Sequence, residues 1–249
     1  MTFLRYYLFI APHVLLGVFL LILFVRRLHR HIPTFTVYVI AEEIFFLCAL
    51  GVTLHRPFSR VAYSWVVLLG NGLTSSLVLA VIYRLADILI FSRFFSFPRL
   101  RVIFAGALAA LILFAGLLSG NLSKITVPMA SNILHVIDFC AGLIQAGMLL
   151  LLLGLTRVLN ISWRNFEAGV ALGFGVSSCI LLAGAALRDH FGHGSIIAID
   201  VLEMTTFHIS VLIWLIYALL PEQRPSSGGG LEKRQIESWN QELERMVRN

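Results

Sequence analysis

The sequence predicts an all-α membrane protein: a bundle of seven transmembrane helices with the N-terminus outside and the C-terminus in the cytoplasm. The first observation is composition, because 59% of the 249 residues are hydrophobic and only 13% are charged. A soluble domain carries about 25% charged residues, and the mean hydropathy here is +0.89. The second observation is pattern. The apolar residues gather in runs of about 20 or more, the length that a helix needs to cross about 30 Å of hydrocarbon.

The apolar runs follow one another along the chain, separated by short connections rich in turn residues or charge. The first run lacks a small-x-small cleavage site and continues into RRLHRH, so a spanning helix is expected there in place of a cleaved leader. No connection is long enough to hold a second domain. The predicted spans are residues 6–25, 34–54, 61–91, 101–119, 130–156, 164–187 and 195–220.

The Lys and Arg residues between the runs set the predicted orientation. With the N-terminus outside, the inner side carries 13 of the 19 and the outer side carries five, with Arg84 left inside the third span. Cytoplasmic loops carry the excess of Lys and Arg, which favours this orientation. The inner set is Arg26, Arg27, Arg30, Arg93, Arg99, Arg101, Arg157, Arg164, Arg224, Lys233, Arg234, Arg245 and Arg248. The outer set is Arg5, Arg56, Arg60, Lys124 and Arg188.

The region after the transmembrane domain of residues 1–221 divides into two segments. Residues 222–230 are rich in Pro, Ser and Gly and predict a flexible linker. Residues 231–249 space apolar side chains near the helical period among charges, which predicts an amphipathic cytoplasmic helix. This helix is expected to lie on the membrane surface or the protein's own inner face, or to bind a cytoplasmic protein partner.

Ionisable residues inside the predicted spans form two groups, and the first lies toward the inner side. Glu42 and Glu43 are adjacent in an apolar run, at a depth of roughly 13 Å for a rise of 1.5 Å per residue. Arg84 has a similar estimated depth in the next span, and Asp87 is one turn away on the same face. Neighbouring residues point about 100° apart on a helix, so both glutamates cannot face one arginine. We therefore expect a structural ion network of Arg84, Asp87 and one of the two glutamates.

The second group lies toward the outer side and forms a candidate polar pocket. Spans one and seven are neighbours in an ordinary seven-helix bundle, which brings their polar residues together. Span five has a histidine and an aspartate three residues apart on one face, and span seven carries the polar residues of IDVLEMTTFH on one broad face. The candidate ligand-binding residues are His13, His135, Asp138, Asp200, Glu203 and His208.

Acids within the spans outnumber the basic groups there, which are one arginine and three histidines. The acids cannot all be ionised without bound cations or water, so some are expected to be protonated. Such groups suit a ligand pocket, a proton relay or a cation site, and they also suit helices joined by hydrogen bonds. Asn71, Thr74, Ser75 and Ser76 in the third span are open to the same two interpretations. The six acids are Glu42, Glu43, Asp87, Asp138, Asp200 and Glu203.

Residue types limit the possible cofactors and partners. The lysines, Lys124 and Lys233, fall outside the predicted spans, so a retinal Schiff base is excluded. No cofactor is predicted, although His13, His135, Asp138 and His208 offer ligands for a metal, and His13 with His208 for a haem. The basic residues sit in short clusters between apolar runs, so the expected partner is the lipid bilayer and not nucleic acid.

Small residues within the spans have structural explanations. Gly169, Gly173 and Gly175 in span six predict close helix packing, because glycine lets neighbouring helices approach. The three cysteines, Cys48, Cys140 and Cys179, fall inside apolar segments without a CxxC pair and are expected to behave as small hydrophobic residues.

Four segments resemble an uncharacterised family of bacterial seven-transmembrane-helix proteins with a short cytoplasmic C-terminal helix. They are HIPTFTVYVIAEE after span one, NISWRNFEAGVALGFGV leading into span six, TFHISVLIWLIYALL in span seven, and WNQELER in the tail. The chain is similar to this family over nearly its full length. The resemblance implies the seven-span topology and a multi-pass location in the bacterial inner membrane. It implies no activity and no catalytic or binding residue.

These observations favour a sensor or receptor-like inner-membrane protein rather than an enzyme. A small ligand or a proton would meet the outer polar group, and the tail would couple to a partner. A metal- or haem-dependent membrane enzyme and a proton or ion pathway are the alternative functions.

Overall fold

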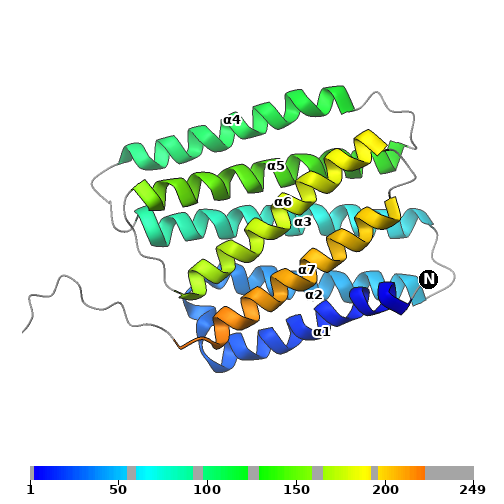
Figure 1. The fold of residues 1–249 in the computed structure, drawn as a ribbon, viewed down its shortest axis with the longest axis horizontal. Coiled ribbons are helices and arrows are strands. Elements are labelled where there is room, and N and C mark those ends of the chain that lie inside the picture. Colours follow the sequence, from blue (N-terminus) through cyan, green and yellow to red (C-terminus); the bar gives the residue numbers. More distant parts are fainter. Residues whose placement is uncertain are drawn as a thin grey trace, which may run out of the picture.

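The computed structural model describes residues 3–54, 60–91, 98–122, 129–158, 165–191 and 196–221, and this part of the chain is helical throughout apart from short turns (Figure 1). The predicted tail segments, residues 222–230 and 231–249, lie outside the described residues. The long helices are α1 (Phe3–Val25), α2 (Pro33–Leu54), α3 (Arg60–Ala86), α4 (Pro98–Leu122), α5 (Met129–Val158), α6 (Asn165–Phe191) and α7 (Ile196–Leu219). A 3₁₀ turn, η1 (Leu28–Arg30), precedes α2, and a π-helical segment, η2 (Asp87–Phe91), continues α3.

Each predicted span corresponds to one of these helices, with ends that agree to within about one turn. Six helices of the described chain are long and apolar enough to cross a membrane: α1, α2, α3, α5, α6 and α7. The remaining predicted span, residues 101–119, falls on α4, where the described residues contain a shorter apolar stretch, Arg101–Ala115. Large apolar side chains face outward from the bundle, as at Leu69 and Leu150. The fold is therefore that of a multi-pass helical membrane protein.

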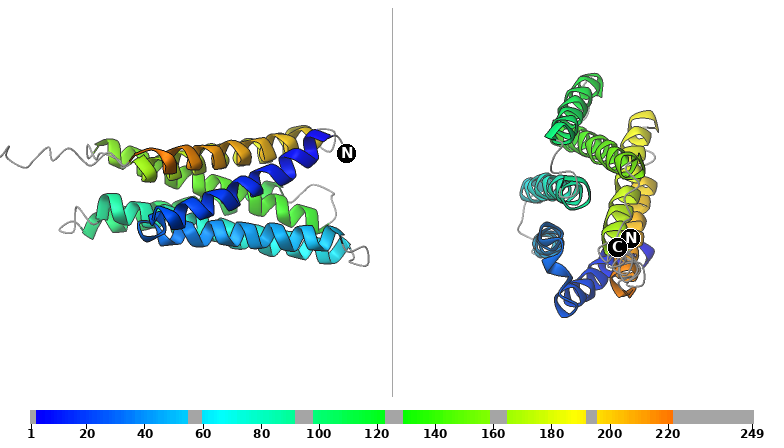
Figure 2. Two further views of the ribbon diagram at one scale, coloured as in Figure 1. Left: turned by 90° about the horizontal axis from the view of Figure 1, so that it is seen from below. Right: turned by 90° about the vertical axis from the view of Figure 1, so that its left-hand side faces the viewer.

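The six long apolar helices form a closed ring (Figure 2). The order around the ring is α1, α2, α3, α5, α6 and α7, and α7 packs against α1 to close it. Spans one and seven are thus neighbours, as predicted. The helix α4 lies outside the ring against α5, so α3 and α5 touch each other directly although α4 separates them in the sequence. This order decides which helix faces look into the middle of the ring.

Close contact between α6 and α7 depends on glycine. A methyl group at Gly169 would overlap the side chain of Tyr217, and one at Gly173 would overlap the indole of Trp214. The prediction of close packing is confirmed at these two positions. At Gly175 nothing lies within 4 Å of the added atom, so that glycine has no packing role here.

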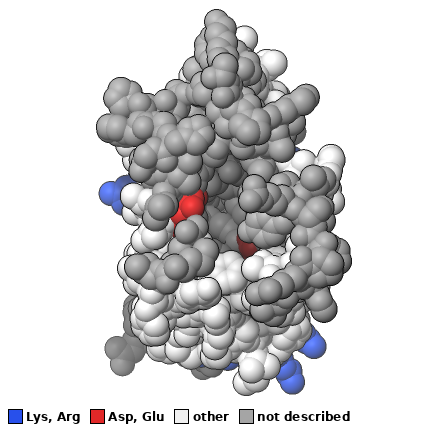
Figure 3. Space-filling model, turned by 90° about the vertical axis from the view of Figure 1, so that its right-hand side faces the viewer, with Lys and Arg blue, Asp and Glu red and all other residues white. Residues whose placement is uncertain are grey.

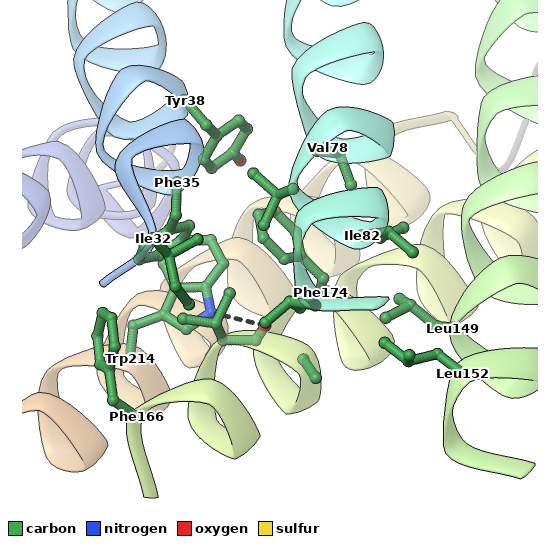
Figure 4. Close-up of a cluster of buried hydrophobic side chains, with 14 of the residues drawn as sticks. Ile32, Phe35, Tyr38, Val78, Ile82, Leu149, Leu152, Phe166, Phe174 and Trp214 are labelled. Atoms are coloured by element: carbon green, nitrogen blue, oxygen red, sulfur yellow. Dashed lines mark hydrogen bonds between the residues drawn. The ribbon is translucent and has the colours of Figure 1, made fainter. Parts of the chain in front are cut away.

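An aromatic and aliphatic core fills one half of the ring (Figure 4). Phe35 of α2 lies edge-on to Phe174 and Trp214, with ring centroids 5.8 and 5.2 Å apart. Tyr38 lies at the edge of this cluster, and its ring centroid is 5.0 Å from that of Phe174. The Trp214 indole donates a hydrogen bond to the Val170 carbonyl at 3.4 Å. Aliphatic side chains from α3, from α5 and from the residue before α2 complete the core; they include Ile32, Ile82, Leu149 and Leu152.

The core lies in the half of the ring that ends at η1. We call this end of the ring the η1 end, and the opposite end, where α1 and α7 begin, the N-terminal end. At the η1 end, the Arg26 guanidinium donates to the carbonyls of Ala218 and Leu220, the latter at 3.3 Å. These bonds join the C-terminal end of α7 to the C-terminal end of α1. The chain turns at the next residue, Arg27, which has a φ of 57°.

Candidate functional site: a polar cavity inside the helix ring

A cavity of about 210 Å³ lies between the helices of the ring, next to the aromatic core. Five helices line it: α2, α3, α5, α6 and α7. Most of the lining side chains are polar, although the helices around them are apolar. The polar lining residues are Tyr38, Glu42, Asn71, Thr74, Ser75, Gln145, Ser177, Glu203 and Thr206, and the apolar ones are Val78, Phe174, Ile180, Leu181 and Phe207.

The helical period explains why these residues share one space. On α3 the lining positions are Asn71, Thr74, Ser75 and Val78, which are three, four and seven residues apart and therefore share one face. Leu73 falls on the opposite side and is 57% exposed. On α7 the lining positions Glu203, Thr206 and Phe207 recur at the same spacing. The cavity is thus lined by the faces of five helices that point into the ring.

The lining residues sit on one side of the core in every helix. Glu42 lies beyond Phe35 and Tyr38 on α2, measured from the η1 end, and Thr74 lies beyond Ile82 on α3. The core therefore closes the cavity toward the η1 end. Figure 3 views the other end of the molecule and shows acidic side chains, in red, inside a hollow of that face.

Hydrogen bonds tie the cavity wall together between helices. Ser178 of α6 donates to the Gln145 side-chain oxygen at 3.3 Å, and the Gln145 amide donates to the Ser75 carbonyl at 3.4 Å. The Ser177 and Ser210 hydroxyls are 2.8 Å apart. Three helices, α3, α5 and α6, thus share one hydrogen-bond chain through a single glutamine. This chain fixes the wall but leaves the space inside it open.

The adjacent glutamates of α2 separate into different environments. Glu42 lines the cavity and is hydrogen-bonded by the phenol of Tyr38, one turn before it. Glu43 points toward α1, where its Oε1 lies 3.6 Å from the Nδ1 of His13. The His13 ring stacks on Phe46 with centroids 3.8 Å apart. Glu43 therefore contacts a basic side chain directly, whereas Glu42 faces the cavity and the Tyr38 phenol and interacts with His13 through electrostatics.

The predicted inner network is only partly present. Arg84 and Asp87 form an ion pair of 2.5 Å, as their spacing predicted. No ion pair joins either glutamate to Arg84 within the described residues. The sequence-based depth match assumes that spans two and three end at one level, and this assumption is wrong.

The register between α2 and α3 gives the reason. Gly70 of α3 lies against the ring of Phe45 of α2. The two helices are antiparallel, so Arg84, fourteen residues after Gly70, is level with residue 31, fourteen before Phe45. At 1.5 Å per residue, that is roughly 16 Å nearer the η1 end than Glu42. The α3 helix and η2 extend past the start of α2, and Arg84 lies on this extension.

The predicted outer pocket also divides. Glu203 lines the cavity, with its carboxyl group against Gly184 of α6. His208 instead lies beside Tyr7 of α1, with ring centroids 5.8 Å apart. His13 lies where α1 meets α2 and α7, beside Phe207 at 5.5 Å. These two histidines, and Asp200, are not among the described lining residues.

Two further candidates, His135 and Asp138, lie on α5 where the side chains are outside the described residues. Of the four α3 residues that the sequence left open to two interpretations, Asn71, Thr74 and Ser75 line the cavity. Ser76 donates to the Gly72 carbonyl of its own helix at 2.7 Å on an exposed face.

Several lining residues were missed by the sequence interpretation. They are Tyr38, Gln145, Ser177 and Thr206. The signals that mark three of these positions are a lone amide in the fifth apolar span, an adjacent pair of serines in the sixth, and hydroxyls four residues apart in the seventh.

The described side chains contain no group of three or more His, Cys, Asp or Glu residues arranged to hold a metal ion. The cavity offers hydrogen-bonding side chains and the carboxyl groups of Glu42 and Glu203. The fold and the cavity define a multi-pass helical membrane protein with a polar space inside its helix ring. No protein-family model, curated protein or solved structure matches the chain.

Proposed function

We propose that this protein is a receptor-like protein of the bacterial inner membrane that binds a small ligand, or takes up protons, in the central cavity. The observation that carries the proposal is the cavity itself: about 210 Å³ of space lined by polar and apolar side chains from five helices. Ligand sites are concave, lined by apolar and aromatic side chains with a few converging polar groups, and commonly lie between the helices of bundles.

The physical cost of the lining supports binding over a purely structural role. An ionised carboxylate near the middle of a membrane-spanning helix costs about 3 kcal/mol on insertion scales, and Glu42 is the tenth residue of the 22 in α2. Polar groups that only join helices reach their partners directly, as Gln145 does. The described hydrogen bonds of Glu42 and Thr74 stay within their own helices, to Tyr38 and to the Asn71 carbonyl, and both residues border open space that a ligand or water can fill.

The aromatic core supports binding over conduction. A proton or ion pathway needs a continuous polar or hydrated route across the membrane. Phe35, Phe174 and Trp214 pack against one another between the cavity and the η1 end. A ligand that enters from the N-terminal end would therefore stop at this core.

The proposed topology has seven spans, which are the six long apolar helices and α4. The N-terminus is outside and the C-terminus is in the cytoplasm. The excess of Lys and Arg on the η1 side supports this orientation. The cavity then opens toward the outside. The helix α4 has 25 residues, about 37 Å at 1.5 Å per residue, and runs alongside α5, which supports a spanning position.

The helix α7 is the proposed route from the cavity to the cytoplasmic tail. Glu203, Thr206 and Phe207 of α7 line the cavity. The other end of α7 is held by Arg26 through the Ala218 and Leu220 carbonyls. A ligand that shifts α7 would alter this clamp, and residues 231–249 would pass the change to a partner protein.

Thermal unfolding of the full-length protein in lipid nanodiscs tests the proposed function. A library of small polar molecules is screened for stabilisation, since a ligand at 100 times its Kd adds about 2.7 kcal/mol. We expect hits whose effect disappears in Ser177→Phe, which fills the cavity, and persists in Leu69→Phe on the lipid-facing side of α3. The absence of any hit that separates these two variants would refute the ligand-binding proposal.

A further inference from the structure

The charge of the cavity identifies the class of ligand. Glu42 from α2 and Glu203 from α7 both line it. Among the lining residues that the structure describes, none is a lysine, arginine or histidine. The two carboxyl groups at the wall thus come from two different helices, and we infer that the ligand is a small organic cation whose ammonium group pairs with Glu42. This inference rests on the proposed binding function.

Glu43, the residue next to Glu42, lies in a different environment. Glu43 has a basic partner in the protein, because His13 lies 3.6 Å away across the α1–α2 contact. His13 itself is held there by stacking on Phe46. Glu42 is bonded to the neutral phenol of Tyr38, which can stabilise a carboxylate by donating but brings no charge. His13 also acts on Glu42 electrostatically, and an ammonium in the cavity would add a direct cationic partner with three N–H donors.

The remaining lining groups fit an ammonium group and an apolar body. Thr74 and Ser177 place hydroxyl oxygens at the wall, where they can accept N–H hydrogen bonds. Tyr38, Phe174 and Phe207 add aromatic faces and edges, and cations are attracted to aromatic faces within about 6 Å. The ligand is therefore amphipathic, with its charge near Glu42 and its body against the aromatic side.

The volume limits the size of this ligand. A cavity of about 150 Å³ binds benzene, and the cavity here is about 210 Å³. One aromatic ring with a one-carbon ammonium arm therefore fits within this volume. Benzylamine, which is protonated at neutral pH, and benzyl alcohol, its neutral counterpart of equal size, form a matched pair of probes. Benzoate adds the opposite charge.

Calorimetric titration of full-length protein in nanodiscs with these three probes tests the inference. Wild type and Glu43→Gln are expected to bind benzylammonium with equal affinity. Glu42→Gln, which keeps size but removes charge, is expected to weaken it at least tenfold, the factor that corresponds to 1.4 kcal/mol. Glu42→Asp keeps the charge and is expected to retain more of the affinity than Glu42→Gln does. Benzyl alcohol should bind weakly and equally to all four proteins, and this signal corrects for partition into the lipid.

The possible outcomes separate the inference from the proposed function. If benzyl alcohol or benzoate binds the wild type as tightly as benzylammonium, and Ser177→Phe blocks it, the cavity binds ligands but the cation assignment is overturned. If Glu42→Gln and Glu43→Gln weaken benzylammonium equally, pairing with Glu42 is overturned. If no probe binds wild type more tightly than Ser177→Phe, the inference fails, and a library screen that also finds no cavity ligand removes the proposed function with it.

Discussion

Replacing Gly173 by alanine tests the contact that holds α6 against α7. The added Cβ would lie 2.7 Å from Cε2 and 2.8 Å from Cδ1 of Trp214, and nearer still to Nε1. Ordinary carbon contacts are about 3.5–4.0 Å, so the indole or the helix must move. The indole is 1% exposed. It also packs against Phe35 and Phe174, which leaves it no free space.

The magnitude follows from three contributions. Overpacking a core costs about 1–3 kcal/mol. Moving the indole also strains the Trp214–Val170 hydrogen bond and the bond from Ser210 to the Gly173 carbonyl, worth about 0.6 kcal/mol each in membrane proteins. Alanine is favoured over glycine in a helix by about 1 kcal/mol, which offsets part of this loss. We expect Gly173→Ala to lower the unfolding free energy by about 1–3 kcal/mol.

Reversible unfolding in mixed detergent micelles, driven by SDS and followed by tryptophan fluorescence, measures this change. Gly175→Ala is the matched control, because it lies two residues away on the same helix with nothing within 4 Å of its new methyl group. The control is expected to be neutral or slightly stabilising. Equal unfolding free energies for the two variants would refute the account of α6–α7 packing.

Three further substitutions test other contacts by the same unfolding assay. Arg26→Ala removes the donor to the last carbonyls of α7 and should cost about 1–2 kcal/mol; wild-type stability would contradict the clamp. A double-mutant cycle with Arg84→Gln and Asp87→Asn should give a coupling free energy below about 1 kcal/mol. The reason is that the two side chains are 42% and 33% exposed. A coupling free energy above about 2 kcal/mol would mean that the ion pair is buried. Gln145→Leu breaks two interhelical hydrogen bonds and should cost about 1 kcal/mol, and a stability gain would show that the chain through α5 is dispensable.

The spans were predictable because length and hydropathy alone decide whether a helix can cross a membrane. The predicted range 61–91 covers α3 and η2 together, and the predicted range 34–54 differs from α2 by one residue. The turn chemistry between the runs placed the ends to within about one turn. These are local properties, and each span could be identified without reference to any other.

The cavity was harder to predict because it depends on how the helices are ordered and aligned. The helix α4 lies outside the ring, which lets Gln145 of α5 reach Ser75 of α3. Apolar composition does not encode that order. The register of α2 against α3, set where Phe45 meets Gly70, also determines that Glu42 and Arg84 lie far apart. Periodicity alone correctly indicated that Glu42 and Glu43 would diverge, but the partner of each required the neighbouring helices.

The proposed function requires that one face of α3, which includes Ser75, lines a hydrated cavity. The opposite face, which includes Leu73, must then contact lipid. Single cysteines at positions 75 and 73, in a variant whose three native cysteines are replaced, test this most directly with a small water-soluble methanethiosulfonate reagent added to intact cells. Only a thiolate reacts, and thiolates form in water rather than in hydrocarbon. We predict rapid labelling of Ser75→Cys and none of Leu73→Cys, although Leu73 is 57% exposed in the isolated structure. Equal labelling of both positions, or preferential labelling at position 73, would contradict the cavity and the membrane placement together.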